Sequence, residues 1–125
     1  MKSREAIIAN YIDGYNHFDI DKMVMDFADA IVFEDSSNGV INMSLSGLTA
    51  FKSQAEVAKS YFAMRQQSVT ALNHEADETT IEIDYHAVLK VDFPNGLKKG
   101  DEFQLKGKSI FKFLGNKIIK LTDLS

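Results

Sequence analysis

Hydrophobic residues recur at helical spacing through the first part of the chain. Five of them lie at positions i, i+3, i+4, i+7 and i+10 and predict a helix over residues 3–17: Ile8, Tyr11, Ile12, Tyr15 and Phe18. Asp19 has a side chain that favours helix N-caps, so it predicts the start of a second helix. The core positions of that helix are Ile20, Met23, Val24 and Phe27.

The hydrophobic period changes after the second helix. Residues 30–34 alternate in a way that predicts a short strand, and residues 35–39 have the composition of a turn. Residues 40–45 form a further short strand or loop. Gly47 then precedes a third predicted helix over residues 48–65. Its apolar stripe consists of Leu48, Phe51, Ala55, Ala58 and Phe62.

Alternation of apolar and polar residues dominates the second half. It predicts strands over residues 69–75, 79–93 and 103–113, with turns at 94–96 and 115–116. In a final strand, one face is shared by Ile119, Leu121 and Asp123. Consecutive strands joined by tight turns form an antiparallel meander. Three helices followed by such a sheet predict an α+β fold.

Composition narrows the class of protein. The 125 residues suit a single domain over residues 1–125, and 45% hydrophobic residues suffice for a core. With 14 basic and 18 acidic residues the net charge is −4, which argues against a nucleic-acid partner. The chain has no cysteine, so thiolate and disulfide chemistry are excluded. No long apolar run or signal-peptide pattern occurs, so we expect no membrane partner and a cytoplasmic location.

Two residues of the first half are candidates for chemistry. Tyr11 lies on the apolar stripe of the first helix, either as a core tyrosine or as a neutral phenol that donates to a ligand oxygen. Asp35 follows the short strand directly. It is either the cap of an Asx turn or a general base at the mouth of a pocket, where partial desolvation raises a carboxyl pKa.

Asp123 is a third candidate, because it shares a strand face with apolar residues. A carboxylate on a buried face is costly unless it is paired or protonated. Asp123 is therefore either a solvated acid at the end of the strand or an acid in a pocket. The histidines, His17, His74 and His86, lack metal-ligand spacing, and no Gly-rich phosphate loop is present. We expect no metal and no cofactor.

Several motifs resemble a known family. Tyr11-Ile12, Asp19-Ile20 and the phrase FADAIVFED, which ends at Asp35, resemble the opening of ketosteroid isomerase-like proteins. Those proteins belong to the nuclear transport factor 2-like superfamily, together with the SnoaL-like polyketide cyclases. Gly47 to Phe51 is similar to the glycine-led third helix of the family, and residues 111–118 are similar to its final hairpin.

The resemblance implies a cone-shaped α+β barrel, in which three N-terminal helices close a pocket formed by a strongly curved antiparallel sheet. Carried over by position, it makes Tyr11 an oxyanion-hole phenol and Asp35 the base that moves a proton. Ser109 stands where the isomerases hold a neutral acid, and Asp123 resembles the late acid of the SnoaL-like cyclases. We expect the pocket to be lined by Tyr11, Tyr15, Phe27, Phe33, Phe51, Phe62, Ser109, Phe111 and Leu121.

Two functions are compatible with these observations. The first is an isomerase-, cyclase- or dehydratase-type enzyme that transfers a proton on an apolar carbonyl compound. The second is a non-catalytic ligand-binding or dimerisation domain of the same fold. An enzyme requires Tyr11 and Asp35 to face one cavity of roughly 300 Å³ or more. In either case we expect a small apolar ligand in the pocket. We also expect a homodimer formed through the outer sheet face around Val88 and Ile110.

Overall fold

Two helices begin the fold of the computed structural model, which describes residues 2–125. Helix α1 spans Arg4–Asn16, and the Ser3 hydroxyl caps it by accepting a hydrogen bond from the backbone N–H of Ala6. Helix α2 spans Ile20–Met23, and its N-cap is Asp19, as the sequence predicts. A Cβ added at Gly14 would lie 2.7 Å from the backbone nitrogen of Met23, so this glycine permits α1 and α2 to approach closely.

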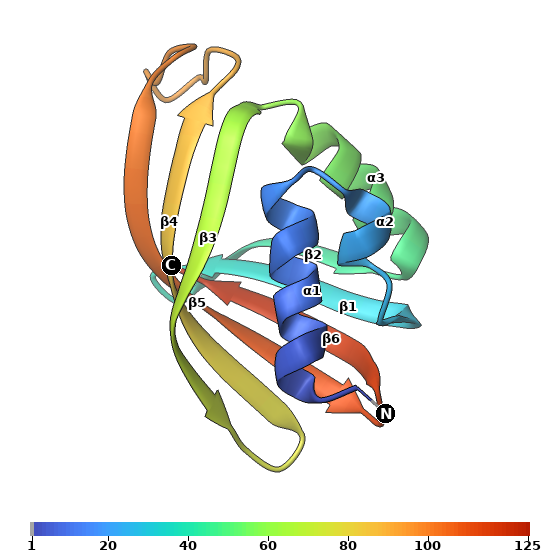
Figure 1. Cartoon of the computed structure of the whole chain (residues 1–125). Helices are drawn as coiled ribbons and strands as arrows, with labels where there is room; N and C mark the ends of the chain where they lie inside the picture. Colours follow the sequence, from blue (N-terminus) through green and yellow to red (C-terminus); the bar gives the residue numbers. More distant parts are fainter. Residues whose placement is uncertain (1) are drawn as a thin grey trace.

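A six-stranded sheet and a third helix follow these two helices (Figure 1). Its strands are β1 (Phe27–Ser37), β2 (Val40–Ser46), β3 (Phe62–His74), β4 (Glu78–Leu89), β5 (Glu102–Leu114) and β6 (Lys117–Leu124). Helix α3 (Leu48–Lys59) lies between β2 and β3 in the chain. The strand order is β2-β1-β6-β5-β4-β3, so the last strand occupies the middle of the sheet. Figure 1 shows the sheet curving around the helices, with α1 across its inner side.

Strands β1 and β2 come between α2 and α3, where the sequence predicts a short strand and a strand or loop. The arrangement corrects two other expectations about the architecture. The sheet is mixed rather than antiparallel, because β1 pairs with β6 in parallel. It is also open rather than closed into a barrel, since the described strands β2 and β3 each have a single neighbour. The α+β class and the antiparallel run from β3 to β6 are as predicted.

Element boundaries differ from the sequence prediction at two places that matter for the site. The third helix ends at Lys59 instead of residue 65, so Phe62 and Arg65 lie on β3. Strand β1 continues to Ser37, so Asp35 lies within a strand and not in a turn. The turn is confined to Asn38 and Gly39, which both have positive φ angles of the kind that join hairpin strands.

The core lies between α1 and the inner face of β5 and β6. Its largest fully buried side chains include Ile8, Phe111 and Leu121. The β5–β6 register shifts between Lys112 and Phe113. Because a shift of one residue exchanges the two faces of a strand, Ile118 is buried in place of the predicted Ile119. Beyond the shift, Leu121 and Asp123 share a face, as predicted.

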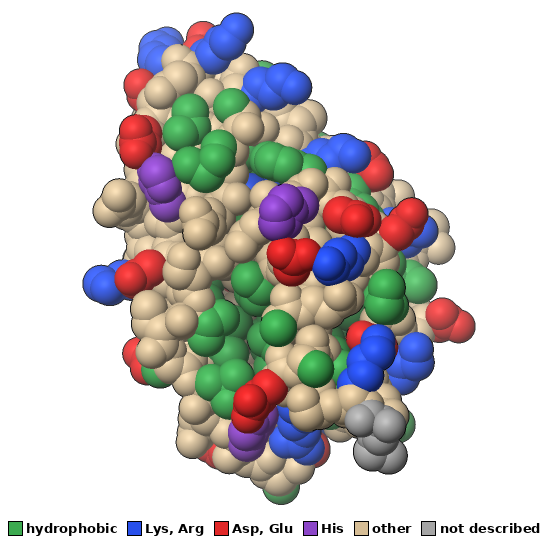
Figure 2. Space-filling view, in the orientation of Figure 1, with side chains coloured by type: hydrophobic (Ala, Val, Ile, Leu, Met, Phe, Trp, Pro, Cys, Tyr) green, Lys and Arg blue, Asp and Glu red, His purple; other side chains and the backbone are tan. Residues whose placement is uncertain are grey.

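The outer face of β4 and β5 carries a ladder of opposite charges. Glu82 pairs in register with Lys108, and Asp84 pairs with Lys106 through an ion pair of 2.9 Å. Figure 2 shows a different side of the molecule, the one on which α1 lies, and there acidic and basic side chains are interspersed with groups of hydrophobic side chains. Within residues 2–125, no helix is long and apolar enough to cross a membrane.

Candidate functional site

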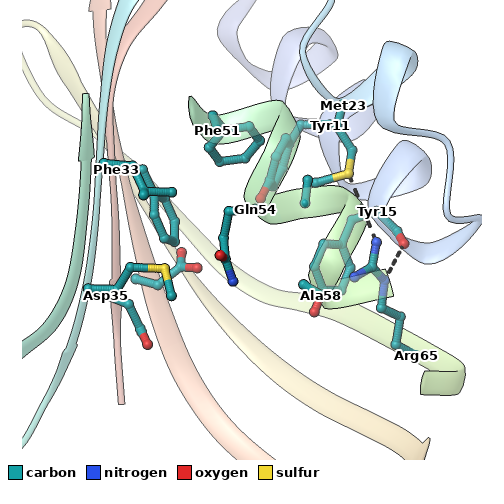
Figure 3. Close-up of a pocket in the computed structure, with 13 residues that line it drawn as sticks. Tyr11, Tyr15, Met23, Phe33, Asp35, Phe51, Gln54, Ala58 and Arg65 are labelled. Atoms are coloured by element: carbon teal, nitrogen blue, oxygen red, sulfur yellow. Dashed lines mark hydrogen bonds between the residues drawn. The ribbon is translucent and has the colours of Figure 1, made fainter. Parts of the chain in front are cut away.

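A cavity of about 240 Å³ opens between α3 and the inner face of the sheet. Figure 3 shows Phe33 and Asp35 on one side of it and Tyr15 and Arg65 on the other, with Gln54 of α3 between them. Its lining comprises Tyr11, Tyr15, Met23, Phe33, Asp35, Met43, Leu45, Phe51, Gln54, Ala55, Ala58, Arg65 and Asp123. The volume is smaller than the roughly 300 Å³ expected from the sequence, which is the lower end of the range typical of drug-sized ligands. The expectation was set for too large a ligand, and the cavity suits a smaller molecule.

Tyr11 projects from α1 into this cavity. Its ring packs at 5.7 Å against Phe27 and at 5.6 Å, edge to face, against Phe111. Burial, and secondarily the nearby charge of Asp123, raises the pKa of Tyr11 well above its ordinary value of 10, so the phenol stays neutral. No group within residues 2–125 forms a hydrogen bond with its hydroxyl. The Tyr11 hydroxyl is therefore available to a ligand.

Asp35 and Asp123 come together because their strands are parallel neighbours. The two residues are Cα partners in the β1–β6 register, and neighbouring strands lie about 4.8 Å apart. Burial raises the pKa of Asp35 above 3.8. Burial, with a further contribution from the charge of Asp35, raises the pKa of Asp123 to about 6. Both acids line the cavity, so it contains a pair of carboxyl groups that are easier to protonate than usual.

Ser109 supports Asp123 from the neighbouring strand β5. The two residues are partners in the antiparallel β5–β6 register, and the Ser109 hydroxyl donates to Asp123 Oδ1 over 2.7 Å. This hydrogen bond lowers the pKa of Asp123, against the larger effect of burial. Ser109 is buried and is not among the residues that line the cavity. It thus holds one oxygen of Asp123 in place.

Arg65 brings a buried positive charge to the opposite wall. Its side chain is only 2% exposed, and its Nε donates to the backbone carbonyl of Tyr15 over 2.8 Å. The guanidinium lies 3.7 Å from the centre of the Tyr15 ring and 4.7 Å from that of Phe18, which favours cation–π contacts. The Tyr15 hydroxyl in turn forms a hydrogen bond of 2.8 Å with that of Tyr85.

The structure brings together some of the predicted site residues and separates others. Tyr11, Tyr15, Phe33, Asp35, Phe51 and Asp123 line the cavity. Outside the lining are Phe27, Phe62, Ser109, Phe111 and Leu121. Phe62 belongs to a separate aromatic group, with ring centres 6.4 Å from Tyr85 and 6.5 Å from Phe103. It lies there because it is on β3 and not on the third helix.

Sequence reasoning did not identify the polar groups on the far side of the cavity. Arg65 was placed at a helix end, and Gln54 carries no pattern that separates it from a surface residue of α3. The apolar lining residues of β2, Met43 and Leu45, were also missed, because that edge strand was predicted only as a strand or loop. Among residues 2–125 there is no cluster of three or more acidic or histidine side chains suited to a metal ion.

Comparison with known proteins gives matches to solved structures only: no protein-family model matches the chain, and no curated protein matches it. A candidate polyketide cyclase from Xanthomonas campestris pv. campestris is 22% identical, with a TM-score of 0.79 over 97% of this chain and 88% of that one. IdmH, a candidate polyketide cyclase from Streptomyces antibioticus, is 10% identical, with a TM-score of 0.79 over 98% and 91% of the two chains.

A third similar structure is a hypothetical protein from Catenulispora acidiphila with a ketosteroid isomerase-like fold, crystallised in complex with trimethylamine. It is 16% identical, with a TM-score of 0.78 over 98% of this chain and 85% of that one. Identities this low establish the fold and leave the activity open. The resemblance seen in the sequence motifs is nevertheless confirmed at the level of structure. The chain therefore has the nuclear transport factor 2-like fold shared by the SnoaL-like and ketosteroid isomerase-like proteins.

Proposed function

We propose that the protein is an enzyme that transfers a proton on a small carbonyl compound bound in the cavity. The observation that carries this proposal is the juxtaposition of Asp35 and Asp123 at a cavity into which Tyr11 also projects. Catalytic acids and bases need pKa values near the working pH, and both carboxyl groups have raised pKa values. A purely structural acid at this place would instead be expected to have a cationic partner.

The two acids take different roles because their environments differ. Asp35 is half-buried, whereas Asp123 has the pKa near 6 and accepts a hydrogen bond from Ser109. The group that ionises first is the base, and the group that keeps its proton is the acid. We therefore assign Asp35 as the base that removes a proton α to the carbonyl. Protonated Asp123 and neutral Tyr11 donate hydrogen bonds to the oxygen on which charge develops.

The test is proton exchange α to the carbonyl, followed by NMR in deuterated buffer with a panel of small ketones and 2-oxo acids. Asp35→Asn should lower the exchange rate by about 10²–10⁴-fold, the usual contribution of a general base. Asp29→Asn is the matched control, because Asp29 lies on the same strand and is exposed. Its rate should equal that of the wild type. An Asp35→Asn variant with wild-type exchange on a confirmed substrate would remove Asp35 from the mechanism.

The pH profile tests the division of roles. With Asp123 as the acid, the exchange rate should fall as the pH rises through about 6, because Asp123 then loses its proton. A rate that instead rises through about 6 would make Asp123 the base. If the panel compounds bind but none exchanges above the buffer rate, the protein is a ligand-binding domain and not an enzyme of this type.

We also propose that the chain forms a homodimer through the outer face of β4 and β5. The in-register pairs Glu82–Lys108 and Asp84–Lys106 give this face alternating charges. Two copies related by a two-fold axis can therefore place the acidic groups of one copy against the basic groups of the other. Light scattering at tens of micromolar should give twice the monomer mass of 14.0 kDa. Ile110→Lys should shift the mass toward the monomer. The control Val69→Lys should not, because the partner of Val69, Ile83, packs against the core on the other face.

A further inference from the structure

The guanidinium of Arg65 is a buried charge in the cavity wall that the proposed proton transfer does not use. It is buried, and an arginine cannot shed its charge by losing a proton. No carboxylate within residues 2–125 lies within ion-pair distance of it. A buried charge without a counter-ion is costly unless other groups stabilise it. A function of Arg65 is therefore needed to explain why the fold keeps this buried charge.

Part of the compensation comes from fixed contacts on one side of the guanidinium. Nε donates to the Tyr15 carbonyl in the last turn of α1, where the helix dipole favours a positive charge. Nη2 contacts the Met23 sulfur at 4.0 Å. The rings of Tyr15 and Phe18 flank the group. Phe18 lies there with a left-handed backbone, φ 59°, which is unfavourable for so bulky a residue. These contacts fix the orientation of the guanidinium without neutralising it.

Arg65 also has a donor that these contacts leave without a partner. Within residues 2–125 Nη1 has no hydrogen-bond partner, and Nη1 is not among the fully buried unpaired atoms. Arg65 also lines the cavity, which Figure 3 shows on the side opposite Asp35. A planar guanidinium with free N–H groups recognises carboxylates, often through two parallel hydrogen bonds. The space beside it holds on the order of ten non-hydrogen atoms, at roughly 30 Å³ each.

We propose that Arg65 binds a carboxylate group of the ligand, so that the cavity takes a small organic acid. This assignment rests on the proposed function in one respect. If the protein transfers a proton on a carbonyl compound, the substrate is a carbonyl compound that also carries a carboxylate. Its carboxylate lies against Arg65, and its reacting carbon lies toward Asp35 and Tyr11. The anion supplies the counter-charge that Arg65 lacks. Asp35 lies on the side of the cavity opposite Arg65, so the negative charge of the base is kept away from the bound carboxylate.

Benzoate and benzamide test this directly, because they have the same size and shape and differ in charge. We expect benzoate to bind the wild type at pH 5.5 about 10-fold more tightly than benzamide, the scale of a hydrogen bond to a charged group. Arg65→Met should reduce this preference to less than about 2-fold. Arg4→Met is the matched control: Arg4 also lies over an aromatic ring, that of Phe113, and donates to backbone carbonyls, but it is outside the cavity. It should keep the preference.

A measurement on the wild type keeps the proposal falsifiable if Arg65→Met does not fold. The chain contains two arginines, so NMR resolves one Nε–Hε signal for Arg65 and one for Arg4. Benzoate should shift the Arg65 signal and leave that of Arg4 in place, and benzamide should shift neither. Failure of both probes to bind, equal binding of the two, or an unchanged preference in a folded Arg65→Met variant would each overturn the proposal. None of these readouts needs turnover, so the outcome is independent of whether Asp35 is a base.

Discussion

Replacement of Asp123 by asparagine measures what it costs the fold to hold a carboxyl group at the cavity. The substitution keeps the size of the side chain, and the asparagine oxygen can still accept the hydrogen bond from Ser109. It removes only the ability to ionise. A carboxyl group whose pKa is raised in the folded state binds more protons there than in the unfolded state, at pH values between the two pKa values. The wild type should therefore lose stability as the pH rises through that window.

The magnitude follows from the two pKa values. The pKa of Asp123 is about 6 in the folded protein, against an ordinary value of 3.8. One pKa unit corresponds to 1.36 kcal/mol, so full ionisation costs the fold about 3 kcal/mol. Part of this is already lost at pH 4. Between pH 4 and pH 8, the unfolding free energy of Asp123→Asn should rise relative to the wild type by about 2–3 kcal/mol.

Urea unfolding at several pH values provides the assay. The difference in unfolding free energy between variant and wild type cancels the titrating groups that both proteins share. Asp35 is the exception, because it interacts with the charge of Asp123, so a trend in the difference belongs to the pair of acids. Asp29→Asn is the control, because Asp29 lies on β1 with its side chain exposed and outside the cavity. A flat difference for Asp123→Asn, or one that falls between pH 4 and pH 8, would refute the idea that burial keeps Asp123 protonated.

Four further measurements test other contacts of the site. Tyr11→Phe should raise the activation free energy of α-proton exchange by about 2–4 kcal/mol, the scale of one lost oxyanion donor. A smaller increase in that activation free energy would make Tyr11 a core residue only. Ser109→Ala should raise the pKa of Asp123 further in a carbon-13 NMR titration, because the lost hydrogen bond lowers it. Gly14→Ala should destabilise the fold by about 1–3 kcal/mol in urea, since its Cβ would meet the backbone nitrogen of Met23 at 2.7 Å. Exchange in Asp123→Asn should no longer fall above pH 6, if Asp123 is the acid.

The sequence predicts the helices and the antiparallel strands well, because each has a face that alternates or recurs at a fixed period. Asp19 caps α2 as expected, and Leu121 and Asp123 share a face of β6. The parallel pairing of β1 with β6 could not be predicted, because it depends on partners at opposite ends of the chain. The same pairing brings Asp35 to Asp123, so their proximity could not be predicted either.

Arg65 shows a different limit of pattern reading. It and Gln67 are both buried on β3, while Gln66 between them is exposed. Alternation of apolar and polar residues identifies a buried face only where that face is apolar. Here polar residues take the inward positions, so a hydrophobic pattern cannot indicate that they point inward. A polar inner face of this kind is itself typical of a site, since a core alone would favour apolar side chains.

The central place of β6 affects how the protein folds. Strands β1 and β5 have no contact with each other in the sheet until β6, which is synthesised after both, inserts between them. Pairing across so long a stretch of chain is slow, because the entropy of loop closure must be overcome first. We therefore expect two partly formed units, α1–α2–β1–β2–α3 and the β3–β4–β5–β6 meander, to form before β1 pairs with β6. Refolding should show native-like hydrogen-exchange protection in β3 to β5 before β1, and the cavity should form only in the last phase.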